Sequence, residues 1–312
     1  MRVLRRLRPN VPAVPSGCVA TIGVFDGIHL GHQRILAQVI DAAARHRVPA
    51  LVFSFEPTPQ EVMNPANPPA RLMRLREKVL ALEEAGIGCL YCPPFDGALQ
   101  SLAPEAFIDQ VLVGQLGIRH LVVGDDFRFA HRRAGTFAHL EAGSRQFGFG
   151  VEAVGGVTVA GQRVSSTAIR QALAAGNVPL AESLLGHPYR MVGRVTRGRQ
   201  LGRELGFPTA NIRLHRRVSP VAGIFAVRIH GIDAGPRDAV ASVGTRPTVD
   251  GVEPLLEVHV FDFDGDLYGR LVAVDFVAHL RDEVRFDDLD AMRRQIARDA
   301  AEARQYLTGA TH

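Results

Sequence analysis

Two histidines stand three residues apart, across a glycine, in the segment GVFDGIHLGH (residues 23–32). The imidazoles of His29 and His32 can both donate hydrogen bonds to one anion, and Gly31 lets a phosphate approach the backbone closely. An apolar run precedes the segment and a helical pattern follows it, so backbone N–H groups and the positive end of a helix dipole also point at the anion. The pattern predicts the phosphate-binding turn of a nucleotide-using enzyme.

The elements around this turn predict a parallel sheet. Apolar residues at 19–22 indicate a buried strand, and those at 35–43 recur at the spacing of one helical face. Further strands are expected at 50–55, 89–92 and 120–124, helices at 71–86 and 104–117, and a proline-rich loop at 56–69. This alternation predicts an α/β, Rossmann-like domain with helices on both faces of the sheet. Ligands in such sheets bind beyond the carboxyl ends of the strands, where GVFDGIHLGH, SFEPTP and GDDFRF lie.

A second hydroxyl-rich motif, SSTAIR, begins at Ser165 and opens a predicted helix that ends at Gly176. Hydroxyl groups at a helix start commonly cap the helix. Alternatively, Ser166, Thr167 and Arg170 form a second phosphate site. The residues alone leave both interpretations open.

The pattern changes after Tyr189 to short alternating strands separated by glycine turns. Such a pattern predicts a small, closed β-barrel. Asp264–Gly265 predicts a hairpin turn between two of these strands, EVHVFDF and RLVAVDF. A terminal helix follows, whose apolar stripe is expected to pack on the barrel: Leu289, Met292, Ile296, Ala300 and Leu307.

Composition restricts the class of protein. The 312 residues, 46% apolar and 22% charged, are enough for two globular domains, and no run reaches the roughly 20 apolar residues of a membrane span. The basic N-terminus lacks the apolar core of a secretory signal, and three cysteines fit a reducing compartment, so a cytoplasmic enzyme is expected. Cys89 and Cys92 are expected to be small buried strand residues. Lys78 is the only lysine, which excludes a Walker A loop.

Taken together, these motifs resemble the bifunctional bacterial riboflavin kinase/FAD synthetases over nearly the whole chain. GVFDGIHLGH and SSTAIR resemble the nucleotidyltransferase motifs of that family, and GRVTRGRQLGRELGFPTANI resembles its kinase ATP loop. GTRPT, EVHVFDFDGDLYG and LRDEVRF then follow in the family's order. The resemblance implies an FMN adenylyltransferase domain at 1–186 and a riboflavin kinase domain at 187–312. ATP would be co-substrate and Mg²⁺ cofactor, with riboflavin, FMN and FAD as substrates and products.

In the first domain the resemblance implies that His29, His32 and Arg170 act directly on the phosphates. It also implies nucleotide contacts from Gly23, Asp26, Gly31, Asp126, Arg163, Ser166 and Thr167. Asp126 is equally well explained as a turn residue. Phe55 and Phe127 are expected either to stack on the flavin ring or to pack in the core.

In the second domain the resemblance implies that Glu257 is the base that deprotonates riboflavin, with Glu253 as its rival. Thr209 and Asn211 would bind Mg²⁺. Gly198, Gly202 and Gly206 would form a flexible lid over the phosphates, and Arg281, Glu283 and Phe286 would contact the flavin. Departures from the family pattern at Thr58, Ala130 and Ser242 remove no group with an assigned chemical role.

Two other interpretations follow from the residues. One is a nucleotidyltransferase, for FMN or another substrate, whose β-domain is not catalytic. The other is a nucleic-acid-binding protein, suggested by the sequence pI of about 9.3. Scattered arginines, 6% aromatic residues and the lack of tryptophan argue against it. We therefore expect small-molecule partners, with neither nucleic acid nor membrane, and leave open a weak homo-oligomer.

Overall fold

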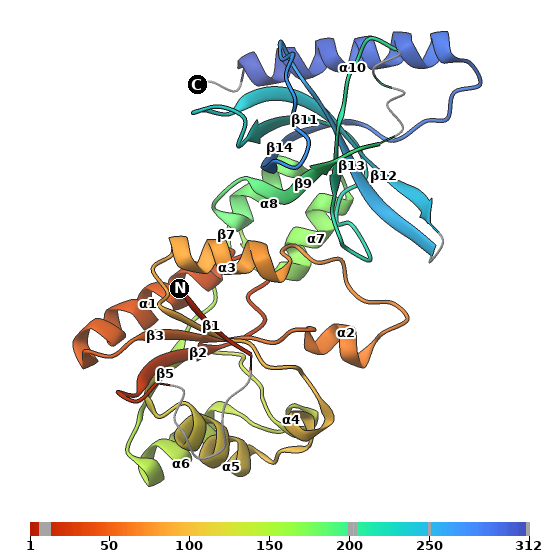
Figure 1. The fold of residues 1–312 in the computed structure, drawn as a ribbon. Coiled ribbons are helices and arrows are strands. Elements are labelled where there is room, and N and C mark those ends of the chain that lie inside the picture. Colours follow the sequence, from red (N-terminus) through yellow and green to blue (C-terminus); the bar gives the residue numbers. More distant parts are fainter. Residues whose placement is uncertain (6–13, 199–201, 203–204, 249–250, 310–312) are drawn as a thin grey trace. The chain divides into compact units, whose positions relative to one another are not determined.

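The computed structural model describes residues 1–5, 14–198, 202, 205–248 and 251–309. These residues form two compact units (Figure 1). The first comprises residues 1–69 and 75–164, and the second comprises residues 70–74 and 165–312. Among the described residues, no helix combines the length and the apolar character that crossing a membrane requires.

A six-stranded parallel sheet forms the centre of the first unit, in the order β1-β4-β3-β2-β5-β6. Its strands are β1 (Arg2–Leu4), β2 (Cys18–Ile22), β3 (Ala50–Phe53), β4 (Cys89–Tyr91), β5 (Ile118–Gly124) and β6 (Gly150–Val154). β2 is buried along its whole length, as a strand covered on both faces must be. The predicted parallel sheet is confirmed.

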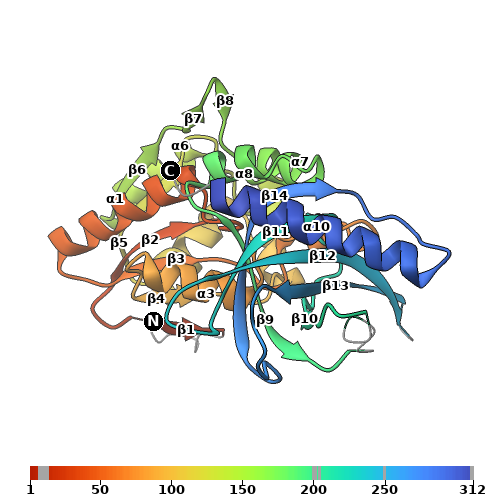
Figure 2. The ribbon, with the colours of Figure 1, turned by 90° about the horizontal axis from the view of Figure 1, so that it is seen from above.

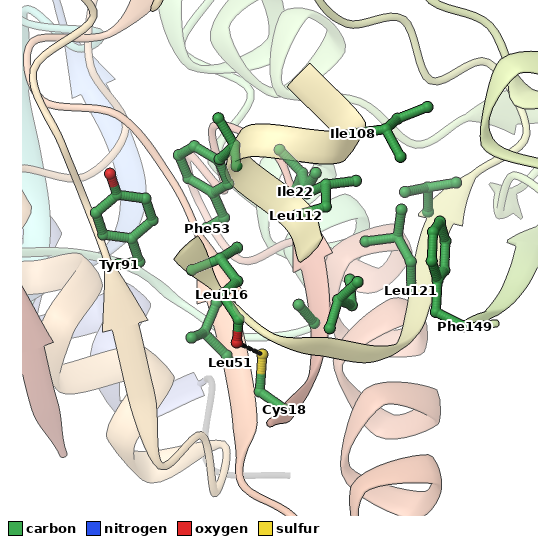
Figure 3. Packing of buried hydrophobic residues seen from close by; sticks show 14 of the residues in the cluster. Cys18, Ile22, Leu51, Phe53, Tyr91, Ile108, Leu112, Leu116, Leu121 and Phe149 are labelled. Atoms are coloured by element: carbon green, nitrogen blue, oxygen red, sulfur yellow. Dashed lines mark hydrogen bonds between the residues drawn. The ribbon is translucent and has the colours of Figure 1, made fainter. Parts of the chain in front are cut away.

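Helices cover both faces of this sheet (Figure 1). They are α1 (Leu30–His46), α2 (Pro59–Met63), α3 (Leu75–Glu84), α4 (Gly97–Ser101), α5 (Pro104–Ala106), a π-helix (Phe107–Gln115), a 3₁₀ turn (His131–Arg133) and α6 (Phe137–Phe147). Ile108 and Leu112 of the π-helix lie in the same core as Phe53 and other sheet residues (Figure 3), and the Phe107 ring of this helix stacks on that of Phe53. The small hairpin β7 (Thr158–Val159) and β8 (Gln162–Arg163) completes the unit.

Buried cysteines lie in this core, as predicted. Cys18, Cys89 and Cys92 are free thiols with at most 4% of their surface exposed. The Cys18 thiol lies within 3.5 Å of the Leu116 carbonyl oxygen (Figure 3), and burial raises its pKa to about 12. A thiol with so high a pKa is almost entirely protonated at neutral pH, so Cys18 is a structural residue.

The prediction that residues 56–69 form a loop, with no helix or strand, is wrong in part. Thr58 begins helix α2 through a capping box, in which the Glu61 amide donates to the Thr58 hydroxyl and the Thr58 amide donates to the Glu61 carboxylate at 2.9 Å. Pro59 occupies the first helical position, where its missing N–H costs no hydrogen bond. Prolines therefore start an element here as well as interrupt one.

A closed antiparallel barrel dominates the second unit, in the order β10-β13-β12-β11-β14-β9. Its strands are β9 (Tyr189–Thr196), β10 (Ala210–Arg213), β11 (Gly223–His230), β12 (Arg237–Thr248), β13 (Gly251–Val260) and β14 (Leu271–Arg281). Two helices precede it, α7 (Ser166–Ala174) and α8 (Val178–Leu185), and α10 (Leu289–Gly309) follows it. The predicted barrel and terminal helix are confirmed.

The hairpin predicted at Asp264–Gly265 is wrong. β13 pairs with β10 and β12, whereas β14 pairs with β9 and β11, so the two strands joined by this segment are not neighbours. A local turn signal does not identify the partner of a strand, because barrel closure sets the pairing. The segment is a connection across the barrel.

Helix α10 packs on the barrel with only part of its apolar stripe (Figure 2). Ala300, Ala303 and Leu307 are buried against β11, β12 and β14, whereas Leu289 is 58% exposed. Met292 and Ile296, between these two regions, are only partly buried. The first half of the stripe is therefore not core.

We expect Phe53→Ala to destabilise the first unit by about 3–5 kcal/mol, because it leaves a cavity among Phe55, Tyr91 and Phe107. Urea denaturation followed by circular dichroism measures the loss. Phe147→Ala is the control, since that ring is 36% exposed and its removal should cost less than about 1 kcal/mol. Equal effects of the two changes would contradict the packing described.

Candidate active sites

The histidine-bearing turn connects β2 to α1 at the carboxyl edge of the sheet. Phe25, Gly27 and Ile28 all have positive φ (49°, 96° and 44°), so the chain reverses within a few residues. His29 is the N-cap of α1, and its Nδ1 accepts a hydrogen bond of 3.2 Å from the His32 amide. Because Nδ1 is an acceptor, the proton of neutral His29 is on Nε2, which is then a donor.

The two imidazole rings stack on each other. Their centroids are 3.6 Å apart with an angle of 14° between planes, and a Cβ at Gly31 would lie 3.3 Å from the His29 ring. Burial, His29 and Lys78 hold the pKa of His32 well below its ordinary value. His32 is therefore neutral at physiological pH.

Gly23 and Asp26 are also predicted to contact the nucleotide, and that contact stays a prediction. Asp26 is buried, with 4% of its surface exposed. Gly23 lies against the Phe25 ring, which a Cβ would approach to 3.0 Å. Both residues shape the turn that presents His29 and His32.

Asp126 and Arg163, two further predicted contacts, form an ion pair with each other at 2.8 Å. Both side chains are more than half exposed, and Asp125 lies 3.5 Å from the same guanidinium. Asp126 is the second residue after the end of β5, at the carboxyl edge of the sheet. Because both side chains are exposed, a ligand can reach them. Breaking an exposed ion pair of this kind also costs little stability.

Phe55 and Phe127, the candidates for flavin stacking, both pack against the core of the first unit. The Phe55 ring contacts those of Phe53 and Phe95 at 5.0 and 5.4 Å, and Phe127 stacks on Phe129 at 5.7 Å. Each ring is partly exposed. The structure thus gives both residues a packing role and leaves part of each ring free.

The SSTAIR motif lies in the second unit, at the start of α7. Ser165 is the N-cap and accepts a 3.2 Å hydrogen bond from the Ala168 amide, so the capping interpretation is confirmed for this hydroxyl. Thr167 is exposed and Ser166 partly buried. Arg170 Nε donates to the Ala70 carbonyl at 2.6 Å. Phosphate binding by Ser166, Thr167 and Arg170 stays a prediction.

A cavity of about 490 Å³ opens in the second unit between the barrel and α10. Three polar residues face each other across neighbouring strands on its wall: Asn211 of β10 and Ser242 of β12 are both register partners of Glu257 in β13. Side chains of register partners lie on the same face of a sheet. Barrel pairing therefore gathers an amide, a hydroxyl and a carboxylate at one place.

Most residues predicted for the kinase site line this cavity. They are Gly202, Thr209, Asn211, Glu257, Arg281, Glu283 and Phe286. Gly198 lies next to it, because a Cβ there would approach the Asn211 side chain to 2.5 Å. Gly206 instead lines a neighbouring hollow of about 400 Å³ with Asp290 and Arg293. The side chain of Glu253 lies outside the described residues.

Several residues of the cavity wall were not predicted for the site from the sequence, among them Ser242, Met292, Ile296 and Asp299. Ser242 donates to Glu283 at 3.4 Å, where Gly244 also makes room for the Glu283 carboxylate. Met292, Ile296 and Asp299 recur at the spacing of one face of α10, and this spacing could have indicated a shared wall of the site. Met292 and Ile296 were instead predicted to be core residues.

Arg281 is anchored by α10. Its Nε and Nη2 donate to the two carboxylate oxygens of Asp299 at 2.8 and 2.6 Å, and Gln295 donates to Asp299 at 2.9 Å. Asp299 is 3% exposed. This bidentate pair joins β14 to α10 and thereby fixes one wall of the cavity.

An α/β unit with an H-x-G-H turn and a barrel with a carboxylate-lined cavity define a class of two-unit transferases of phosphorus-containing groups. An FAD synthetase family model matches residues 11–168, and a riboflavin kinase model matches residues 185–307. The chain belongs to the family of bifunctional riboflavin kinase/FMN adenylyltransferases.

Relatives bearing that description match over almost their full length. Those from Haemophilus influenzae and Escherichia coli K12 are each 44% identical over 98% of this chain, covering 99% and 98% of the relative. One from Pseudomonas fluorescens is 45% identical over 100% of this chain and 99% of its own. A crystal structure described as a macrolide-efflux protein from Streptococcus pneumoniae aligns with a TM-score of 0.81 at 31% identity, over 96% and 97% of the two chains.

Asp299→Asn should destabilise the second unit by about 3–5 kcal/mol, because it leaves the Arg281 guanidinium partly buried without its counter-charge. Arg304→Gln is the matched control. It removes another bidentate arginine–aspartate pair, with Asp262, whose side chains are 48% and 77% exposed, and should cost less than about 1 kcal/mol. Thermal and urea unfolding of both variants give the comparison; a larger loss in the Arg304 variant would contradict this account.

Proposed function

We propose that this chain makes FAD from riboflavin in two ATP-dependent reactions. The domain at 187–312 transfers the γ-phosphoryl group of ATP to riboflavin and forms FMN. The domain at 1–186 transfers the adenylyl group of a second ATP to FMN and releases pyrophosphate. The match of one family model to each half, in the same order as the two candidate sites, carries the proposal.

In adenylyl transfer the attacking FMN phosphate is already an anion, so the reaction needs no general base. Positioning and charge stabilisation then supply most of the catalysis. Nε2–H of His29 is a donor for the α- or β-phosphate, and the N-terminal amides of α1 add donors beside it. Gly31 leaves space for the phosphates at this point.

The remaining predicted groups of this site are assigned by the resemblance. Ser166, Thr167 and Arg170 hold the outer phosphates, and Asp126 and Arg163 contact the nucleotide. Phe55 and Phe127 place their partly exposed rings against the flavin. These roles remain proposals.

Riboflavin phosphorylation differs because a neutral hydroxyl must lose its proton. Glu257 is half-buried on the cavity wall and is the carboxylate we assign as general base. The apolar side chains of Met292, Ile296 and Phe286 and the polar ones of Glu283 and Arg281 suit the two ends of a flavin. The choice of Glu257 over Glu253 follows the resemblance and stays a prediction.

Mg²⁺ fits the donor set of this cavity. Thr209 and Asn211 offer a hydroxyl and an amide oxygen, and Mg²⁺ in phosphoryl-transfer sites commonly takes few protein ligands with the rest from phosphate and water. The ion neutralises charge on the ATP phosphates when bound. Thr209 and Asn211 would hold the ion in the cavity that Glu257 also lines.

One assay tests the whole proposal: riboflavin, ATP and Mg²⁺ incubated with the protein, with flavins separated by chromatography over time. FMN should appear first and FAD afterwards. FAD formation from added FMN without any phosphorylation of riboflavin would instead support a non-catalytic barrel. A cytoplasmic location and weak self-association also stay predictions.

His29→Ala should lower kcat/KM for FAD formation about 100- to 1000-fold, since a donor to the reacting phosphates is lost. FMN formation should stay within about twofold of the unchanged protein. Separate assays that start from FMN and from riboflavin measure the two effects in the same preparation. Equal loss of both activities would contradict the assignment.

Glu257→Gln should have the opposite pattern. The amide keeps the shape of the carboxylate and cannot accept the riboflavin proton, so FMN formation should fall about 100- to 10,000-fold. FAD formation from added FMN should persist. Glu283→Gln is the control on the same wall, and it should affect KM for riboflavin more than kcat. A reversed ranking of the two variants would assign the base to Glu283.

A further inference from the structure

The only lysine of the chain is buried in the first unit. Lys78 lies on α3 with 2% of its surface exposed. Lysine is almost never fully buried without a partner, because taking its charge out of water is costly. Arginine supplies the other 35 strong basic groups, so a buried lysine here calls for a local explanation.

Lys78 is connected to the histidine-bearing turn by hydrogen bonds. Its Nζ donates to Ser54 Oγ at 3.1 Å, and Ser54 Oγ donates to the Val24 carbonyl at 3.1 Å. Ser54 is completely buried just after β3, and Val24 belongs to the turn that carries His29 and His32. The ammonium group therefore reaches the backbone of the turn through one hydroxyl.

The same ammonium group acts electrostatically on His32. The lowered pKa of His32 has three causes: burial first, then His29, then Lys78. His29 lies at the end of the turn, His32 on α1 and Lys78 on α3. Two buried carboxylates lie close to these groups in sequence: Asp26 in the turn and Glu77 next to Lys78. Within the described residues His32 Nδ1 is buried without a hydrogen-bond partner, so protonating it would add an unpaired charge.

We propose that Lys78 is a positioning residue for adenylyl transfer, which acts on the histidine-bearing turn through Ser54 and on His32 through its charge. The inference rests on the proposed role of that turn. The cation attracts the polyphosphate bound at the turn, and it disfavours a positive charge on His32, whose ring stacks on that of His29. Small size and three donors suit lysine to this enclosed place better than the planar guanidinium of arginine.

Lys78→Met tests the proposal, because it keeps the length of the side chain and removes the charge. Loss of a neighbouring cation favours protonation, so the pKa of His32 should rise toward 6.5. FAD formation should fall at least tenfold, mainly in kcat, and its acidic limb should move to higher pH. FMN formation in the same chain should stay within twofold and report that the protein is folded.

Ser54→Ala is the matched control, since it breaks the bridge to Val24 and keeps the cation. It should lower FAD formation only a few-fold and leave the acidic limb where it is. Histidine titrations followed by NMR, with His32 identified by His32→Asn, give the pKa directly. An unchanged His32 titration in Lys78→Met would overturn the proposal, whatever happens to activity.

A second measurement uses the folded, otherwise unchanged protein. Lysine labelled with ¹³C at Cε gives one signal for the whole chain, because Lys78 is the only lysine. His32→Asn should shift that signal and its titration, whereas no shift would also overturn the proposal. Full FAD formation in His29→Ala would reject the proposed role of the turn itself. The His32 titration tests the Lys78 proposal separately, so the two failures can be told apart.

Discussion

Parallel pairing of β2 with β3 and β5 is the constraint on which the first site depends. Parallel strands end at the same edge of a sheet, so the segments after Ile22, Phe53 and Gly124 must all leave from that edge. β2 is buried along its whole length, and the chain passes from this edge through the turn into α1. The positive φ angles of Phe25 and Ile28 are the local cost of that reversal, and placing His29 at the N-cap of α1 is its result.

A different constraint forms the second site. Closure of the barrel makes Asn211 and Ser242 the two neighbours of Glu257, although the three residues are far apart in sequence. The barrel alone leaves this polar group on an open surface. Helix α10 completes the cavity. Its Ala303 and Leu307 pack against the strands, whereas its Met292 and Ile296 line the cavity between the helix and the barrel. The Arg281–Asp299 pair then fixes how closely the helix approaches.

Local patterns were sufficient to predict the parts of the structure that local physics decides. Apolar periodicity predicted β2, α1 and α10, and the residue types of GVFDGIHLGH predicted the turn. Strand pairing was not predictable in this way, because Asp264–Gly265 has the composition of a hairpin turn yet connects strands that are not neighbours. Asp299 and Ser242 were missed for the same reason: their roles come from register and helix docking, and neither has a local signature. The resemblance, and no spacing rule, identified Glu257.

The two proposed reactions make opposite demands on charge, and the two units answer them with different residues. An attacking phosphate is already charged, so the first site needs donors that do not titrate away. Burial, with His29 and Lys78 nearby, keeps His32 neutral, and the hydrogen bond that His29 Nδ1 accepts from the His32 amide leaves Nε2 as the donor atom of the neutral His29 ring. A hydroxyl nucleophile instead needs an acceptor for its proton, a role that we propose for the Glu257 carboxylate in the second cavity. Imidazole donors in one unit and a carboxylate in the other therefore follow from the protonation state of each nucleophile. Exchange of these groups between the two sites would leave each nucleophile without the partner that its chemistry requires.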